Sequence, residues 1–255
     1  MVQRRHCRRE ATTAGSRPQV THATTSSAAA IVGAMHDGRY ERNEQDFMRL
    51  VVRPGSHVVD VGAHIGFHTC LLAGLVGSDG LVTAFEPLAE HVAELARNIA
   101  NEDVQQRVRI VPAAVADVSG SRTMIAAATG LAPANACFCD EEPLVRDGYT
   151  VMRQVPVVTL DDEVGRLPVA FLKLDAEGAE ALVLRGARRL LTDHHPVVLA
   201  DLHPHLMKHL DLTAPEALIR EMAEIGYECR LLGAGVAGPR IADVHASGVT
   251  AVVFL

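Results

Sequence analysis

The sequence that decides the fold reads Val58–Val59–Asp60–Val61–Gly62–Ala63–His64–Ile65–Gly66. It begins as a short β-branched run after Pro54–Gly55, which is typical of a buried strand. It continues into a turn whose two glycines let the backbone fold tightly and let a ligand approach without a Cβ in the way. The following residues, 67–76, have a helical pattern. The segment therefore predicts a strand, a turn suited to a ligand, and a helix.

Strand-like and helix-like patterns alternate along the remaining chain. Strands are expected at residues 57–61, 81–85, 108–111, 170–174 and 197–202, with two more near 227–232 and 250–255. Helical patterns occupy residues 67–76, 92–99, 178–191 and 215–225. Because right-handed crossovers leave few arrangements, this order predicts an α/β fold: a doubly wound, mainly parallel seven-stranded sheet with helices on both faces and an antiparallel edge strand. Ligands bind at the carboxyl ends of strands in such sheets.

The first 36 residues differ in composition from the rest of the chain. They are rich in Arg, Thr, Ser and Ala, and five arginines against Glu10 give them a net charge of +4. This composition is typical of a disordered tail, so we expect one domain over residues 37–255. Within that domain, residues 120–158 have β-like pieces on either side of a stretch with Gly, Pro and Asp. They predict an inserted hairpin or flap.

Charge and composition limit the classes of partner. The chain has 24 basic and 31 acidic residues, a formal net charge of −7, so the part beyond the tail carries −11. Clustered Lys and Arg supply most of the affinity for a phosphate backbone, and nucleic acid is therefore not an expected partner. No stretch reaches the roughly 18 apolar residues of a membrane span, so we expect a soluble, cytoplasmic protein without a membrane partner. Five cysteines at no recurring spacing indicate neither a disulfide framework nor a zinc site.

Acidic residues after three successive strands indicate a nucleoside-containing cofactor. A dinucleotide-binding turn has Gly at its first, third and sixth positions, but here these are Gly62, His64 and Phe67. Asp60 is unfavourable beside a pyrophosphate and favourable beside an ammonium and a sulfonium. Glu86, before Pro87, can accept hydrogen bonds from both ribose hydroxyls. Asp117 lies where an adenine amino group is expected, although an Asp before Ser119–Gly120 also suits a plain turn.

A second acidic group follows the strand at residues 170–174. The sequence Lys173–Leu174–Asp175–Ala176–Glu177–Gly178–Ala179–Glu180 places three carboxylates within six positions, and a cleft that holds a cation offsets their repulsion. Asp175 and Glu177 are the catalytic candidates, while Glu180 is expected to complement the helix dipole. His203, after the next strand, titrates near neutrality and is expected to take the proton from an attacking hydroxyl. Alternatively, a divalent cation is held by Asp175, Glu177, Asp201 and His203, but the main hypothesis includes no metal.

These motifs, in this order, resemble the FkbM family of S-adenosylmethionine-dependent methyltransferases. The similar segments are residues 58–66, Phe85–Glu86–Pro87, and 171–180 continued by Val183–Leu184–Arg185–Gly186–Ala187, and the resemblance covers about residues 37–255. The family usually has Asn at the position of His64 and commonly Glu at that of Asp201. The resemblance implies that S-adenosyl-L-methionine is the cofactor, with its methionine part at residues 60–66, its ribose at Glu86 and its methyl group near Asp175. The cofactor-binding residues expected on this basis are Asp60, Gly62, Ala63, His64, Gly66, Thr69, Glu86, Pro87, Asp117 and Asp175, and the catalytic residues are Asp175, Glu177 and His203.

The resemblance further implies O-methylation of a hydroxyl on a small molecule of secondary metabolism, such as a natural product, sugar or lipid. Methylation of a nucleic-acid base is disfavoured, because the residues after Asp175 include no proline or aromatic that would hold a flipped base. Two alternatives stay open at this point. One is an NAD(P)-dependent oxidoreductase on a related fold, and the other is a non-catalytic nucleoside-binding module.

Overall fold

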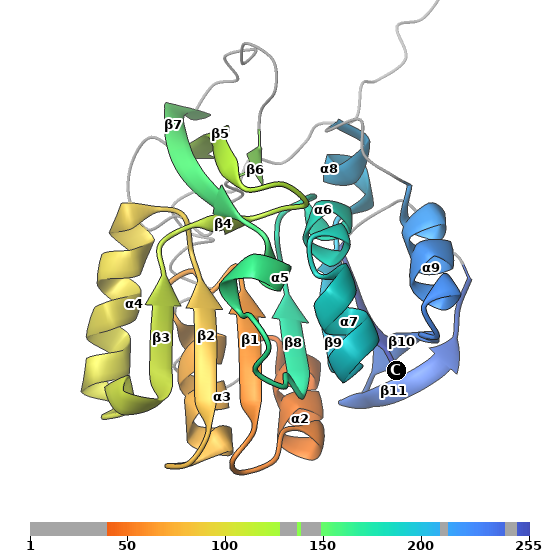
Figure 1. Ribbon diagram of the computed structural model, residues 1–255, viewed down its shortest axis with the longest axis horizontal. Helices are drawn as coiled ribbons and strands as arrows, with labels where there is room; N and C mark the ends of the chain where they lie inside the picture. Colours follow the sequence, from red (N-terminus) through yellow and green to blue (C-terminus); the bar gives the residue numbers. More distant parts are fainter. Residues whose placement is uncertain (1–39, 128–136, 139–148, 210–213, 243–248) are drawn as a thin grey trace, which may run out of the picture.

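A central sheet of eight strands organises the computed structural model, which describes residues 40–127, 137–138, 149–209, 214–242 and 249–255 (Figure 1). Its strand order is β11-β10-β12-β9-β8-β1-β2-β3. The strands are β1 (His57–Val61), β2 (Leu81–Phe85), β3 (Val108–Val111), β8 (Phe171–Leu174), β9 (Val197–Leu202), β10 (Cys229–Gly233), β11 (Val236–Arg240) and β12 (Thr250–Phe254). The strands from β9 to β3 are parallel, whereas β12 runs antiparallel to both β9 and β10.

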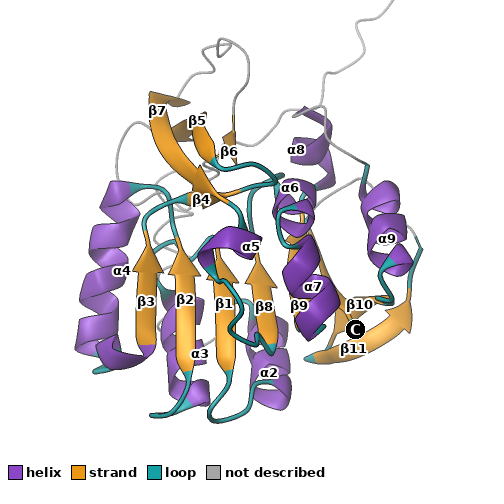
Figure 2. Cartoon of the chain, in the orientation of Figure 1, coloured by secondary structure: helices purple, strands orange, loops and turns teal. Residues whose placement is uncertain are grey.

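Helices cover both faces of this sheet (Figure 2). They are α2 (Arg42–Val51), α3 (Phe67–Val76), α4 (Ala89–Asn101), α5 (Leu160–Glu163), α6 (Glu180–Arg185), α7 (Arg188–His194), α8 (Pro204–His209) and α9 (Pro215–Glu224), with a 3₁₀ turn at Gln105–Arg107. Successive side chains of each strand point to opposite faces of the sheet, because the strand is pleated. Val58 and Phe171 pack with α2, α3 and α4, whereas Val59 and Leu172 pack with α5, α6, α7 and α9. The central strands are therefore mostly apolar on both faces.

A second sheet lies over the carboxyl ends of the parallel strands (Figure 1). It consists of β4 (Ala114–Val115), β5 (Gly120–Ala127), β6 (Cys137–Phe138) and β7 (Tyr149–Val158), in the order β4-β7-β5-β6. β5 and β7 pair antiparallel over most of their length. Residues 128–136 and 139–148 of the expected insertion lie outside the described residues.

The fold class expected from the sequence is confirmed, with two differences in the sheet. The described residues include an eighth strand, β11, at the edge, and the predicted antiparallel strand, β12, lies inside the sheet instead. β11 contains Gly238 and Pro239, which are rare in strands and hid it from prediction.

The single helix expected at residues 178–191 is divided into α6 and α7. The break falls at Gly186, where an added Cβ would lie 2.0 Å from the carbonyl oxygen of Ala116. The close approach of another backbone, which no local pattern encodes, explains this difference.

The described helices include none that is long and apolar enough to cross a membrane. The expected tail at residues 1–36 lies outside the described residues and stays a prediction.

Candidate functional site

A cavity of about 500 Å³ opens at the carboxyl ends of the parallel strands. This volume is within the range of pockets that bind small molecules and cofactors. Its lining includes most of the residues expected from the sequence: Asp60, Gly62, Ala63, His64, Glu86, Pro87, Asp175, Glu177 and His203. The chain thus brings residues from four strand ends into one place.

The strand register explains this convergence. Val61 of β1 pairs with Phe85 of β2 and with Leu174 of β8. The next residue along each strand is therefore Gly62, Glu86 or Asp175, and all three emerge side by side at the same edge of the sheet. β9 continues the row, because Leu174 pairs with Ala200 and Asp201 follows.

The turn after β1 requires glycine. Gly62 has a φ of +82°, and an added Cβ would lie 1.8 Å from the carbonyl oxygen of Asp175. The amides of Gly62 and Ala63 both donate to the carbonyl of Phe85, at 3.1 and 3.0 Å. The turn is therefore held against β2 and β8, with its backbone exposed to the cavity.

Asp60 is a buried carboxylate at the floor of the cavity. Its Oδ2 accepts a hydrogen bond of 2.6 Å from the Thr69 hydroxyl, and burial raises its pKa. Thr69 does not line the cavity and would act only through Asp60. Gly66 is also outside the lining, because its Cβ position faces Leu95 at 2.4 Å and so serves helix packing.

Glu86 holds two loops together at the end of β2. Its Oε2 accepts from the backbone amide of His64 at 3.0 Å, and its Oε1 accepts from the amide of Leu88 at 3.0 Å and lies 3.2 Å from His91 Nδ1. Burial lowers the pKa of His64 to about 4, so this imidazole is neutral, and its buried Nε2 has no hydrogen-bond partner in the described part of the chain. A nitrogen of this kind is available to a bound ligand.

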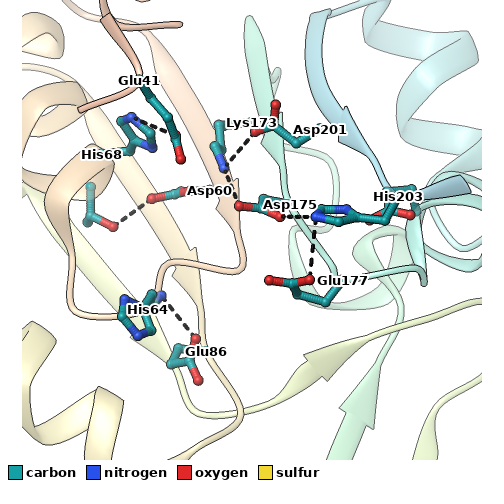
Figure 3. A network of polar contacts seen from close by, with 12 residues as sticks. Glu41, Asp60, His64, His68, Glu86, Lys173, Asp175, Glu177, Asp201 and His203 are labelled. Atoms are coloured by element: carbon teal, nitrogen blue, oxygen red, sulfur yellow. Dashed lines mark hydrogen bonds and ion pairs between the residues drawn. The ribbon is translucent and has the colours of Figure 1, made fainter. Parts of the chain in front are cut away.

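Lys173 is a buried cation that the sequence analysis did not select. Its side chain is only 2% exposed, and Nζ lies 3.2 Å from Asp175 Oδ2 and 3.4 Å from Asp201 Oδ2 (Figure 3). Burial alone would lower the pKa of Lys173, but the nearby carboxylates outweigh it and hold this pKa well above its ordinary value. A lysine in the middle of the apolar strand Phe171–Leu174 was the signal that could have identified it.

The two carboxylates beside Lys173 differ in their titration. Burial raises the pKa of Asp175, but the charges of Lys173 and His203 more than compensate, and the net pKa is lowered. Burial dominates at Asp201, where Lys173 compensates only in part and the pKa rises to about 7. Oδ1 of Asp175 and Oδ2 of Asp201 are both buried without a hydrogen-bond donor among the described residues.

His203 is surrounded by three carboxylates. Nδ1 lies 3.0 Å from Glu180 Oε1, while Nε2 lies 3.4 Å from Glu177 Oε2 and 3.8 Å from Asp175 Oδ1. Burial lowers its pKa, but these carboxylates, Glu180 first, more than compensate and raise it to about 9. A ring that carries a proton on both nitrogens cannot accept another, so these contacts do not favour His203 as the base, and that role stays a prediction. Glu180, expected to act on the helix dipole, is fully buried and instead orients this imidazole.

The structure places Asp117 away from the cavity lining, with its Oδ1 3.6 Å from Arg122 of β5. Its expected role at adenine therefore stays a prediction without support from this geometry. Other lining residues were not expected, among them Tyr40, Glu41, His68, Met124 and Phe138. They come from the two residues before α2, from α3 and from the second sheet, and only the tertiary fold brings them to the cavity.

Residues 60–229 match the family model described as "Methyltransferase FkbM domain". Among curated proteins, no sequence matches the chain. Among solved structures, a methyltransferase FkbM from Methylobacillus flagellatus KT is 18% identical with a TM-score of 0.51, and the match covers 89% of this chain but only 54% of that one. This chain thus spans about half the length of that protein, and the likeness shows a shared fold.

Two other solved structures are similar at lower TM-scores. A putative rRNA-methylase from Clostridium thermocellum is 11% identical, with a TM-score of 0.47 and coverage of 82% of this chain and 91% of that one. A SAM-dependent O-methyltransferase from Thermotoga maritima is 13% identical, with a TM-score of 0.47 and coverage of 88% and 70%.

Proposed function

The chain belongs to the FkbM methyltransferase family, and from that premise we propose that it transfers the methyl group of S-adenosylmethionine to a hydroxyl group of a small molecule. The observation that carries this proposal is the row formed by Gly62, Glu86 and Asp175, which the strand register aligns along one cavity. Membership in a methyltransferase family argues against the nicotinamide-dependent alternative.

The residues present fit the cofactor. S-adenosylmethionine carries a ribose diol, an ammonium and a sulfonium, and a cavity bordered by carboxylates favours both cations. Oε2 of Glu86 accepts one hydrogen bond in the structure, so it retains capacity for a ribose hydroxyl. We assign Asp60 and Gly62 to the methionine side and Glu86 to the ribose.

When bound, the cofactor supplies an electrophilic methyl carbon. The protein must then align an acceptor oxygen with that carbon, exclude water and help the hydroxyl lose its proton. Asp175, Glu177 and His203 border the cavity at the place where we expect the acceptor. A carboxylate of this cluster could accept the proton of an acceptor hydroxyl. A cation held by the cluster could instead lower the pKa of that hydroxyl.

A hydroxylated small molecule is the acceptor class that we favour. The residues after Asp175 are Ala176, Glu177 and Gly178, which cannot stack on a flipped base. The chain is also acidic overall, which opposes binding to a polyphosphate backbone.

Mass spectrometry with isotope-labelled S-adenosylmethionine tests the proposal. The protein is incubated with a library of hydroxylated metabolites and with matched amines, and products are examined for a labelled methyl group on oxygen. Asp175→Asn should abolish transfer, whereas Glu224→Gln, which changes an exposed carboxylate away from the cavity, should leave it unchanged. Methylation of the amines alone would contradict the O-methyltransferase assignment. Cofactor binding without transfer to any compound would favour the non-catalytic alternative.

A further inference from the structure

We propose that Asp175, Glu177 and His203 form a divalent-cation site in the wall of the cavity. Each residue offers one ligand atom, either a carboxylate oxygen or an imidazole nitrogen, and the three atoms lie within 4.8 Å of one another. Divalent ions bind such atoms at about 2.0–2.6 Å, so two ligands of one ion lie roughly 3–5 Å apart. The three side chains are thus already close to a coordinating arrangement.

Neighbouring residues orient two of these ligands. Nζ of Lys173 hydrogen-bonds to Asp175 Oδ2, which leaves Oδ1 on the side of His203 (Figure 3). Glu180 holds Nδ1 of His203, so Nε2 faces Asp175 and Glu177. A carboxylate behind the far nitrogen of an imidazole is the usual support of a metal-binding histidine. Glu180 is therefore a positioning residue for the site.

Two buried carboxylate oxygens also favour a positive ligand in this cavity, one in the cluster and one beside it. Oδ1 of Asp175 is buried, and no described residue donates a hydrogen bond to it. The same holds for Oδ2 of Asp201, whose side chain is only 9% exposed and whose close cation is Lys173 at 3.4 Å. A buried carboxylate oxygen without a donor is costly, and a bound cation removes that cost.

The charge of the cavity also favours a cation. Its lining has seven carboxylates, from Glu41, Glu44, Asp60, Glu86, Asp175, Glu177 and Asp201. Among the described lining residues, Lys173 is the one lysine, and there is no arginine. A divalent ion would offset part of this excess where three of the side chains converge.

The donor set of two carboxylates and one imidazole suits a divalent ion such as Mn²⁺. A cation here would take the place of a proton on Nε2 of His203 and would lower the pKa of an acceptor hydroxyl beside it. In the transfer, the bond between carbon and the acceptor oxygen forms as the bond between carbon and sulfur breaks. The hydroxyl proton passes to water, leaving an ether and a thioether. The role of the ion in activating the hydroxyl rests on the proposed function, whereas the binding of the ion to these three residues does not.

Electron paramagnetic resonance of Mn²⁺ added to the whole, chelator-treated chain tests the site. We expect one saturable Mn²⁺ per chain and a ¹⁴N coupling from an imidazole in the pulsed spectrum. Glu177→Gln should weaken binding by about 10-fold or more, and His203→Asn should remove the ¹⁴N coupling. Glu224→Gln, at an exposed carboxylate outside the cavity, should bind Mn²⁺ as the unchanged protein does.

Lack of saturable Mn²⁺ binding at millimolar concentrations would overturn the proposal. Equal binding by Glu177→Gln and the unchanged protein would overturn it as well, because the ion would then lie elsewhere. Calorimetry with S-adenosylhomocysteine in the presence of chelator separates this outcome from a failure of the proposed function. If the nucleoside binds and Mn²⁺ does not, the metal site alone is wrong; if neither binds, both proposals are wrong.

Discussion

Replacing Lys173 with methionine should destabilise the protein strongly. Nζ lies within 3.4 Å of two carboxylates, those of Asp175 and Asp201, and its side chain is almost fully buried. Methionine has a similar length but no charge, so it would leave both carboxylates without their cation. Breaking a buried ion pair by removing one partner typically costs about 3–5 kcal/mol.

This loss is large compared with the total stability of a domain, which is about 5–15 kcal/mol. For a chain of this size it corresponds to a decrease in melting temperature of about 6–20 °C. Urea unfolding, followed by circular dichroism in buffer with chelator, measures the free energy of unfolding. Arg220→Met, which removes an exposed cation, is the matched control and should change stability by less than about 0.5 kcal/mol.

A double-mutant cycle tests the cause of the loss. Adding Asp201→Asn to Lys173→Met removes one of the stranded carboxylates, so the double variant should be less destabilised than the sum of the two single variants. A loss of less than about 1 kcal/mol for Lys173→Met, or strict additivity in the cycle, would refute the network of buried charges described for this cavity.

Three further predictions follow from the site. Glu86→Gln should raise the dissociation constant of S-adenosylhomocysteine by about 10-fold or more in calorimetry, because a charged hydrogen-bond acceptor is lost. Glu90→Gln, at an exposed carboxylate, is the control, and equal affinity of the two variants would exclude Glu86 from the site. Burial, followed by the charge of Lys173, lowers the pKa of His68 from 6.5 to about 3. The unfolded chain therefore binds a proton below pH 6.5 that the folded chain does not. His68 by itself should cost about 2 kcal/mol of stability between pH 7 and pH 5, measured as the difference in pH dependence between the unchanged protein and His68→Gln; the same pH dependence in both proteins would contradict this. Gly62→Ala and Gly55→Ala both place a side chain at a φ near +80°, but only the first meets backbone, at 1.8 Å. Gly62→Ala should therefore unfold at lower urea and lose cofactor affinity, whereas Gly55→Ala should lose about 1 kcal/mol and keep it.

The fold class was predictable because local patterns agree along the chain. Apolar strands, glycine turns and periodic helices occur in one order, and the carboxyl ends of parallel strands necessarily share an edge. The positions of Asp60, Glu86 and Asp175 at the cavity follow from this rule. β11 was not predicted because residues Val236–Arg240 have little local preference for a strand. They form one through their pairing with β10.

The protonation states of the site residues were less predictable than their location. His203 was selected for its ordinary titration near neutrality, but that value holds only without the three carboxylates that the fold gathers around it. Glu180 comes to His203 from α6 across 23 positions of sequence, and Lys173 reaches Asp201 across 28. Long-range contacts of this kind set pKa values, and a sequence pattern does not encode them.

Titration calorimetry of the purified chain with S-adenosylhomocysteine tests the central claim most directly. We predict one binding site per chain, with an affinity that Glu86→Gln weakens and Glu224→Gln does not change. A folded protein that releases no heat with this nucleoside up to millimolar concentrations would contradict the assignment of the cavity to the methyl donor.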